Sequence, residues 1–263
     1  MKVIIDTDST TAPYDNVTSI SVDSEDANFP KENMRDDFTT NLWRAAAGVL
    51  TAKITLQVSK GSGVMLMNTN ATSVVVEAGS GESCANESGW VYETGYANAD
   101  DEVATISVYS LPGKGGRLWA DYSVFTVPHI VTITLTAAAA VYAGIVRAGV
   151  VEEFRDPTWD LGEGSIDYSI ERELNNGANY FRKRNVIRQY DNISIIETRA
   201  NCWKLKHDIF DAVGPQPLAI RIIQNALFTD WEFVVFAKRA SLPQINHINN
   251  AYSRVNFGLQ EVI

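Results

Sequence analysis

The feature that most constrains the fold is a series of short β-favouring segments in the first 150 residues, each closed by a turn signal. The segments alternate apolar with polar residues and are rich in Val, Thr and Ile, and they span 53–58, 63–67, 73–77, 102–109 and 131–136. Gly, Asn, Asp and Ser cluster between them, at 60–63, 79–81, 98–101 and 112–116. Strands this short and this regularly interrupted predict an antiparallel β-sandwich of the jelly-roll type.

Residues 151–263 continue the β pattern and add one helix. Apolar residues at helical spacing follow Thr198, an expected N-cap, and Gly214 ends the pattern, which predicts a helix near 199–213. Turn signals at 175–177 and 190–192 divide the preceding stretch into three expected strands, and later strands are expected at 218–224, 232–238 and 254–262. We therefore predict a mainly β protein with domains at 1–150 and 151–263.

Cysteine and histidine are too few and too scattered for a metal or disulfide framework. The chain of 263 residues has 2 Cys, Cys84 and Cys202, far apart, and 3 His, none in an H-x-x-x-H pair. The sequence thus predicts no metal site and no cofactor. Stability must come from packing, for which a 45% apolar composition is sufficient.

The charge balance disfavours nucleic acid and membrane partners. The chain has 22 Lys+Arg against 32 Asp+Glu, a formal net charge of -10, which opposes binding to DNA, RNA or anionic lipid. The most apolar stretch, 131–151, contains three Thr and Arg147, so no segment reaches the roughly 18 apolar residues of a membrane span. We expect a soluble chain without membrane insertion or a conventional export signal.

Nothing in the sequence predicts catalysis. The nucleophile-elbow, zinc-protease, phosphate-loop and dinucleotide-binding motifs are absent, and His129, His207 and His247 each have an ordinary structural interpretation. Acidic clusters at 6–8, 23–26 and 100–102 favour solvated loops over calcium sites, because none has the EF-hand spacing. We expect no enzyme activity; a glycosidase using carboxylates of 100–102 is the enzymatic alternative.

Three tryptophans, Trp43, Trp90 and Trp119, lie in or beside expected loops of the first domain. Sugar-binding proteins stack rings on aromatic side chains at such places, whereas core packing is the ordinary alternative. Trp90 and Trp119 are accordingly the candidate glycan contacts.

Residues 27–44, Ala-Asn-Phe-Pro-Lys-Glu-Asn-Met-Arg-Asp-Asp-Phe-Thr-Thr-Asn-Leu-Trp-Arg, resemble the entry segment of discoidin-like, carbohydrate-binding jelly rolls. The matching positions are Asn33, Met34, Asp36, Thr39 or Thr40, Trp43 and Arg44. The resemblance implies a compact loop in which Asp36 and Asn33 bond backbone amides while a buried Trp43 closes one end of the sandwich. It covers residues 1–150 and leaves the ligand-contacting residues unassigned.

The second half contains a series of short motifs, among them 142–145, 162–164, 167–169, 174–178 and 257–263. In the order of these motifs it resembles minor tail and distal-tail proteins of tailed bacteriophages. It implies a tail-tube-like β-sandwich with one flanking helix, and a hexameric or trimeric ring at the tail tip that contacts tail-tube and other tail-tip proteins. The protein would then be made in the bacterial cytoplasm and reside in the virion, with DNA passing through an acidic ring without specific binding.

The basic residues Arg182, Lys183, Arg184 and Arg188 form a local run in an acidic chain, and they are the candidate subunit interface. A phage-tail ring subunit is the leading hypothesis. The alternative is a carbohydrate-binding protein that recognises host surface glycans through the first domain.

Overall fold

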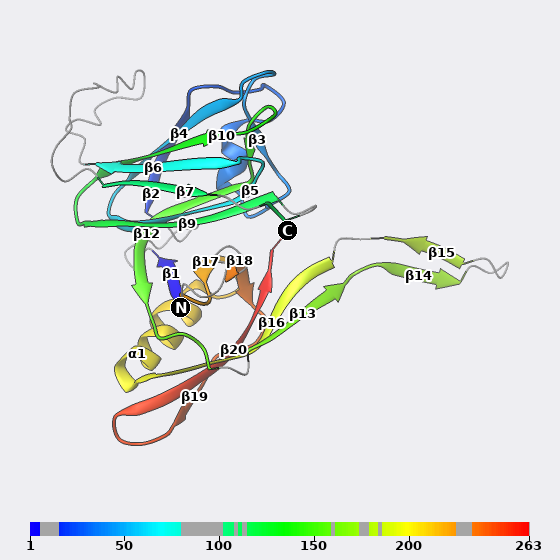
Figure 1. Ribbon diagram of the computed structural model, residues 1–263. Coiled ribbons are helices and arrows are strands. Elements are labelled where there is room, and N and C mark those ends of the chain that lie inside the picture. The colour runs from blue at the N-terminus through cyan, green and yellow to red at the C-terminus, as the bar shows by residue number, and fades with distance from the viewer. Residues whose placement is uncertain are drawn as a thin grey trace. The chain divides into compact units, whose positions relative to one another are not determined.

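The computed structural model describes residues 1–5, 16–79, 102–107, 110–111, 115–158, 161–173, 179–183, 186–224 and 233–262; at 102–111 and 170–180 only the backbone is described. The chain divides into two compact units. Unit 1 comprises Met1–Val3 and Glu153–Ile263, and unit 2 comprises Ile4–Glu152. The domain boundary expected from the sequence, between residues 150 and 151, lies beside the start of the longer segment of unit 1. The fold is mainly β, as predicted (Figure 1).

Unit 2 is a β-sandwich. One sheet has the strand order β2-β4-β10-β6-β7, formed by Val17–Val22, Thr51–Val58, His129–Thr136, Ser73–Gly79 and Glu102–Ser107. Strands β12, β5, β9 and β8 follow one another in the facing layer, formed by Ile145–Glu153, Gly61–Thr69, Gly115–Phe125 and Ser110–Leu111. The pairs are antiparallel; in β4 and β10, for example, Ile54 lies opposite Ile133. The expected short strands are therefore confirmed, with ends shifted by a few residues.

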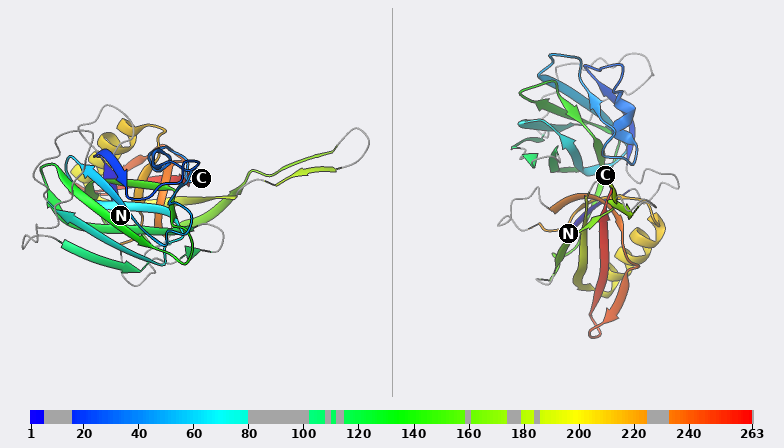
Figure 2. Two further views of the ribbon diagram at one scale, coloured as in Figure 1. Left: turned by 90° about the horizontal axis from the view of Figure 1, so that it is seen from above. Right: turned by 90° about the vertical axis from the view of Figure 1, so that its right-hand side faces the viewer.

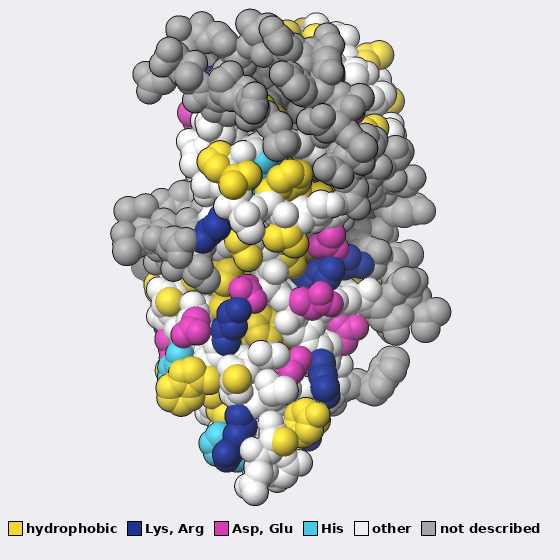
Figure 3. Space-filling model, turned by 90° about the vertical axis from the view of Figure 1, so that its left-hand side faces the viewer, with side chains coloured by type: hydrophobic (Ala, Val, Ile, Leu, Met, Phe, Trp, Pro, Cys, Tyr) yellow, Lys and Arg dark blue, Asp and Glu magenta, His cyan; other side chains and the backbone are white. Residues whose placement is uncertain are grey.

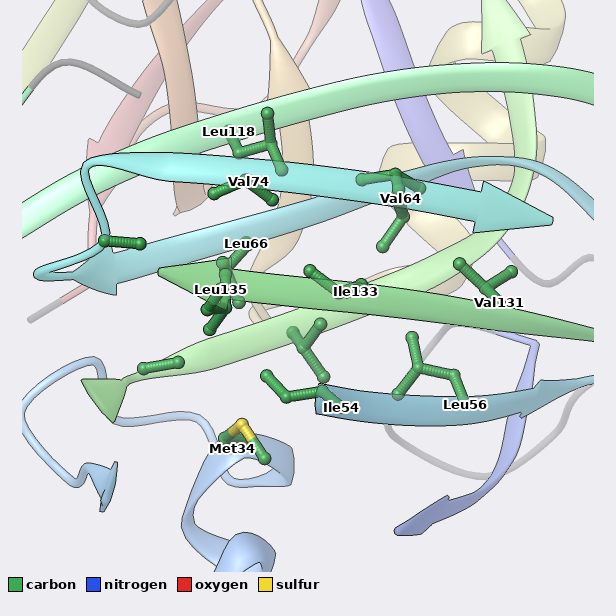
Figure 4. Close-up of a cluster of buried hydrophobic side chains, with 14 of the residues drawn as sticks. Met34, Ile54, Leu56, Val64, Leu66, Val74, Leu118, Val131, Ile133 and Leu135 are labelled. Atoms are coloured by element: carbon green, nitrogen blue, oxygen red, sulfur yellow. The ribbon is translucent and has the colours of Figure 1, made fainter. Parts of the chain in front are cut away.

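The core of unit 2 lies between these two layers. Ile54, Leu56 and Ile133 from one sheet and Val64 and Leu66 from the other are fully buried (Figure 4). Alternate residues of β4 point into this core, which is the period-two burial that its sequence predicts. Burial of apolar side chains from both layers is the main stabilising contribution in this unit.

One end of the sandwich is closed by a 3₁₀ helix, Lys31–Arg35, and by a short ladder between β3 (Trp43–Arg44) and β11 (Tyr142–Ala143). Trp43 is 0% exposed and belongs to the core cluster, so the expectation that it is buried is confirmed. Asp36 accepts a hydrogen bond from a backbone amide, that of Phe38, as expected. The expectation that the Asn33 side chain also bonds a backbone amide is wrong, because its side-chain nitrogen donates to the carbonyl of Leu42.

Unit 1 is a sheet packed against one helix. Its strand order is β13-β16-β20-β18-β17-β1, formed by Gly162–Asp167, Val186–Thr198, Tyr252–Glu261, Val234–Arg239, Leu218–Arg221 and Lys2–Ile5, and β19 (Gln244–His247) pairs with β20. Val255, Phe257 and Leu259 of β20 are buried, as their alternation predicts. On the face shown in Figure 3, the acidic and basic side chains that are coloured lie interspersed.

The helix of unit 1 begins as α1 (Arg199–Trp203) and continues with π-helical pairing over Lys204–Asp211. Thr198 caps it by accepting a hydrogen bond from the Asn201 amide, and Gly214 ends it at a φ of +68°. Phe210 packs on Phe257 of β20, with ring centroids 4.8 Å apart, which joins the helix to the sheet. The predicted helix, its cap and its stop are therefore confirmed.

Unit 1 also contains a separate two-stranded sheet. It is formed by the antiparallel strands β14 (Ile170–Glu173) and β15 (Asn179–Arg182). It follows β13 in the chain and extends beyond the end of that strand (Figures 1 and 2). The turn expected at 190–192 is wrong, because these residues lie inside β16. Asn192 has a φ of +57° there and the register with β20 shifts between Tyr190 and Ile193, which is a β-bulge.

Candidate functional site

The loop 36–41 of unit 2 presents an aromatic ring to solvent. It joins the 3₁₀ helix to β3, and the Phe38 side chain is 55% exposed although it is large and apolar. Asp37, Thr40 and Asn41 are exposed on the same loop, whereas Thr39 is 7% exposed and points inward. An apolar ring is thus surrounded in sequence by carboxylate, hydroxyl and amide groups. We call residues 36–41 the platform loop.

Hydrogen bonds within the platform loop fix its conformation. The Asp36 carboxylate accepts from the Phe38 amide at 2.9 Å and from the Asn41 side chain at 2.5 Å, and the Asn41 amide donates to the Phe38 carbonyl at 3.2 Å. One Asp side chain therefore bonds both the backbone beside the aromatic residue and the far end of the loop. Such Asx turns favour a single loop geometry.

Two residues outside the platform loop, Asn68 and Gly144, contact the backbone of the loop at Thr39. Asn68, at the end of β5, donates from its side chain to the Thr39 carbonyl at 2.6 Å and adopts a φ of +55°. Gly144 lies against the same carbonyl, and a Cβ at that position would approach the Thr39 oxygen to 2.8 Å. The hydrogen bond from Asn68 and the close approach of Gly144 therefore leave the loop little space to move.

A buried guanidinium completes the support. Arg147 on β12 is 3% exposed, and its two terminal nitrogens donate to the carbonyl oxygens of Met34, Arg35, Asp36 and Val146 and to a carboxylate oxygen of Asp37. The platform loop is therefore attached to β12, to β5 and to itself. An exposed aromatic ring on an immobilised polar loop can stack on an apolar face of a ligand while neighbouring groups form hydrogen bonds with its polar edge.

The two tryptophans predicted as glycan contacts do not lie on this loop. Trp119 is on β9, where it is 7% exposed and its indole N–H donates to Asp121 at 2.9 Å, so its ring is not an open stacking surface. Trp90 lies outside the described residues. Sequence reasoning missed Phe38, whose signal would have been a lone aromatic residue in the otherwise polar string Asp-Asp-Phe-Thr-Thr-Asn.

The predicted interface residues separate into two groups. Arg182 and Lys183 are exposed beside the end of β15. Arg188 has a side chain 12% exposed, pairs with Glu163 across the β13–β16 ladder and lies over the Tyr190 ring at 5.3 Å. Its charge is therefore engaged within unit 1. Arg184 lies outside the described residues.

The histidines and the described cysteine are held in structural contacts. His129 is 1% exposed, stacks on Phe125 with centroids 4.5 Å apart and has Nε2 at 3.1 Å from the Tyr122 hydroxyl; burial lowers the pKa of His129 and raises that of Tyr122. His207 pairs with Asp211 at 3.0 Å. His129 is therefore buried in structural contacts, whereas His207, expected as a solvated side chain on the helix, is partly exposed and pairs with Asp211.

In the part of the chain that the structure describes, the Ser253 hydroxyl lies 2.8 Å from His247 Nδ1, a Ser–His contact. Ser253 is 0% exposed, so no substrate carbonyl can reach its oxygen. The nearby Cys202 thiol is 1% exposed, and burial raises its pKa, which keeps it protonated and weakly nucleophilic.

Across the described ranges, no three His, Cys, Asp or Glu side chains come together as ligands for a metal ion. Within the same ranges, no helix is long and apolar enough to cross a membrane. The acidic residues of 23–26 are partly used for local structure, since Asp23 accepts from the Lys53 amide and Asp26 from the Asn28 amide. The clusters at 6–8 and 100–101 lie outside the described residues.

Comparison with known proteins gives structural likeness alone. No family model matches the sequence, and no curated protein matches it. A chain from the crystal structure of reduced XRCC1 bound to the DNA polymerase β catalytic domain is 20% identical, with a TM-score of 0.38, and the match covers 52% of this chain and 99% of that one.

Two carbohydrate-binding modules give similar values. Chitosan-binding module 1 from the chitosanase/glucanase of Paenibacillus sp. IK-5 is 18% identical with a TM-score of 0.35, covering 52% of this chain and 96% of the module. The family 32 module of C. perfringens NanJ, in complex with galactose, is 11% identical with a TM-score of 0.33, covering 58% and 100%. These TM-scores lie below 0.5, so no function is transferred from any of these structures.

Proposed function

We propose that unit 2 is a carbohydrate-binding domain and that its platform loop is the binding surface. The proposal rests on Phe38, whose ring is 55% exposed on a loop that is held by hydrogen bonds involving Asp36, Asn68 and Arg147. Leaving such a ring in water forgoes the free energy that its burial would give, which a ligand with an apolar face recovers.

The polar groups around Phe38 suit a sugar. A pyranose has an apolar C–H face, which stacks on an aromatic ring, and a rim of hydroxyl groups, which both donate and accept hydrogen bonds. Asp37 accepts, Asn41 donates and accepts, and the Thr40 hydroxyl does either. Because the loop is already fixed, little conformational entropy is lost on binding.

The test is binding of the full chain to an array of immobilised oligosaccharides containing hexoses and N-acetylhexosamines. We expect the wild-type chain to retain at least one class of glycan and Phe38→Ala to lose it, with at least about a tenfold rise in Kd, equivalent to about 1.4 kcal/mol. Circular dichroism should show both proteins equally folded.

Phe181→Ala is the matched control, since Phe181 is also an exposed phenylalanine, at 63%, but lies in unit 1. Its glycan binding should equal that of the wild type. Unchanged binding in Phe38→Ala would contradict the assignment of the platform loop, and the absence of any binding by the wild type would contradict the function.

A second candidate function concerns unit 1: assembly of several copies of the chain, as in the ring of a bacteriophage tail. The observation that favours assembly is the β14–β15 hairpin, with a ladder of four residue pairs and exposed Phe181, Arg182 and Lys183 at its end. A two-stranded hairpin alone is marginally stable in water, so a neighbouring surface would complete it. The phage-tail role rests on the sequence resemblance.

Mass photometry of the full chain at low and high salt tests this second function. Assembly through Arg182 and Lys183 against the acidic surface of another copy predicts a multiple of 29.0 kDa that dissociates as salt is raised. A single species at 29.0 kDa at every salt concentration and at high protein concentration would contradict it.

A further inference from the structure

Arg147 is a buried charge of unit 2 whose guanidinium is surrounded by hydrogen-bond acceptors. Its Nη1 donates to the Met34 carbonyl at 3.2 Å and to the Val146 carbonyl at 3.0 Å. Its Nη2 donates to the Arg35 carbonyl of the 3₁₀ helix at 3.4 Å and to two acceptors of the platform loop, the Asp36 carbonyl at 2.7 Å and the Asp37 carboxylate at 3.4 Å. The side chain is 3% exposed, so these groups replace its water shell.

This arrangement turns several backbone oxygens toward one point. Three consecutive carbonyls, those of residues 34–36, share a single guanidinium, and oxygens gathered in this way repel one another unless a cation lies between them. Burying an unpaired charge is costly, and so is burying carbonyls without donors. The loop and Arg147 are therefore mutually dependent.

We infer that Arg147 is the positioning residue of the glycan-binding surface: its guanidinium acts as a built-in cation that sets the backbone from which Phe38 projects. The inference rests on the proposed function of the platform loop. Arg147 itself is buried and does not reach a ligand. Its effect passes through Asp36, whose carbonyl it binds and whose carboxylate holds the Phe38 amide and the Asn41 side chain.

A planar fork is required, and positive charge alone does not suffice. The five acceptors are divided between two nitrogens held in one plane, which matches a guanidinium. A lysine ammonium offers a single nitrogen with three donors and cannot serve both sets. Arg147→Lys should therefore keep the charge but lose part of the loop geometry.

The experiment compares glycan affinity and thermal unfolding for the full-length wild type, Arg147→Ala, Arg147→Lys and Val131→Ala. Val131 is a core residue on β10, so its variant reports what general destabilisation does to binding. We expect about a tenfold or larger rise in Kd for Arg147→Ala, a smaller rise for Arg147→Lys and none for Val131→Ala while each is folded. Methylguanidinium should lower the Kd of Arg147→Ala, and methylammonium at the same concentration should not.

Wild-type affinity in folded Arg147→Ala, or equal rescue by methylammonium, would overturn the inference. If Arg147→Ala does not fold, Arg147→Lys decides, and wild-type affinity in that variant would overturn the role of the fork. If the wild type binds no glycan, the proposed function fails. The cation role is then judged separately by Tm, which methylguanidinium should raise in Arg147→Ala but not in the wild type.

Discussion

Two exposed phenylalanines are supported in different ways. Phe38 is 55% exposed on a loop held by Arg147, Asn68 and Asp36, whereas Phe181 is 63% exposed within a hairpin that pairs through its own ladder of four residue pairs. The first arrangement is prepared before any ligand arrives, which suits a small molecule. The second gains most from a large surface that packs along it, which suits another protein chain.

The largest expected effect is on the support of the platform loop. Replacing Trp43 by Ala removes a fully buried indole from the core of unit 2 and should cost about 3 to 5 kcal/mol in the free energy of unfolding of that unit. Urea denaturation measures this loss. Hydrogen exchange should show faster exchange in unit 2 and unchanged exchange in the β14–β15 hairpin; a loss below about 1 kcal/mol would mean that Trp43 is not a packing residue.

The next largest effect on the platform loop is expected when a single methyl group is added at Gly144. A Cβ on Gly144 would lie 2.8 Å from the Thr39 carbonyl and 3.0 Å from the Asn68 Cβ, so the loop must shift. We expect Gly144→Ala to cost about 1 to 3 kcal/mol and to weaken glycan binding in the folded protein. Gly48→Ala is the comparison, because its Cβ would meet nothing within 4 Å and its cost comes from the φ of +83° alone.

If glycan binding falls as much in Gly48→Ala as in Gly144→Ala, contact with Thr39 is not what fixes the loop. Equal binding in Gly144→Ala and wild type would lead to the same conclusion.

Acidification should destabilise the sandwich through His129. Burial lowers the pKa of this imidazole in the folded state below its ordinary value of 6.5, so the unfolded chain binds the proton more readily. The free energy of unfolding should therefore fall as the pH drops below about 6.5 and level off below the folded pKa. Urea midpoints between pH 8 and pH 5 measure this, and His129→Gln should flatten that part of the profile; an identical slope in both proteins would contradict it.

The smallest stability effect is expected at the hairpin. Phe181→Ala removes an exposed side chain and should change the free energy of unfolding by less than about 0.5 kcal/mol. It should nevertheless reduce the assembled fraction in mass photometry, because the exposed phenyl ring of Phe181 is expected to pack against another copy of the chain. A large loss of monomer stability would show instead that Phe181 packs within its own unit.

Much of the fold follows from local patterns, and the exceptions have physical causes. β4, β10 and β20 alternate cleanly and were predictable, as was the helix between Thr198 and Gly214. No strand was predicted over β9, Gly115–Phe125, where Arg117 and Asp121 interrupt the apolar pattern, yet Arg117 is 4% exposed in the strand. Charged residues at buried positions depend on partners distant in sequence, which no local pattern reveals.

The candidate site shows the same limit. The segment 27–44 predicted a compact loop and a buried Trp43, and the structure has an Asp36-bonded loop and a Trp43 that is 0% exposed. The exposure of Phe38 was not predictable, because it depends on Asn68 and Arg147, which lie about 30 and 110 residues away in the chain. Asp191 and Asn192 predicted a turn. In the structure they lie inside β16, where the residues on both sides pair with β20, and they form a β-bulge instead.

The two phenylalanines are assigned separate functions, and a crossed comparison of Phe38→Ala and Phe181→Ala distinguishes them. Each variant and the wild type are assayed for binding to the oligosaccharide array and for mass distribution by mass photometry. We expect Phe38→Ala to lose glycan binding with unchanged mass, and Phe181→Ala to keep glycan binding and lose assembled species. Loss of glycan binding in Phe181→Ala, or its retention at wild-type affinity in Phe38→Ala, would contradict this assignment.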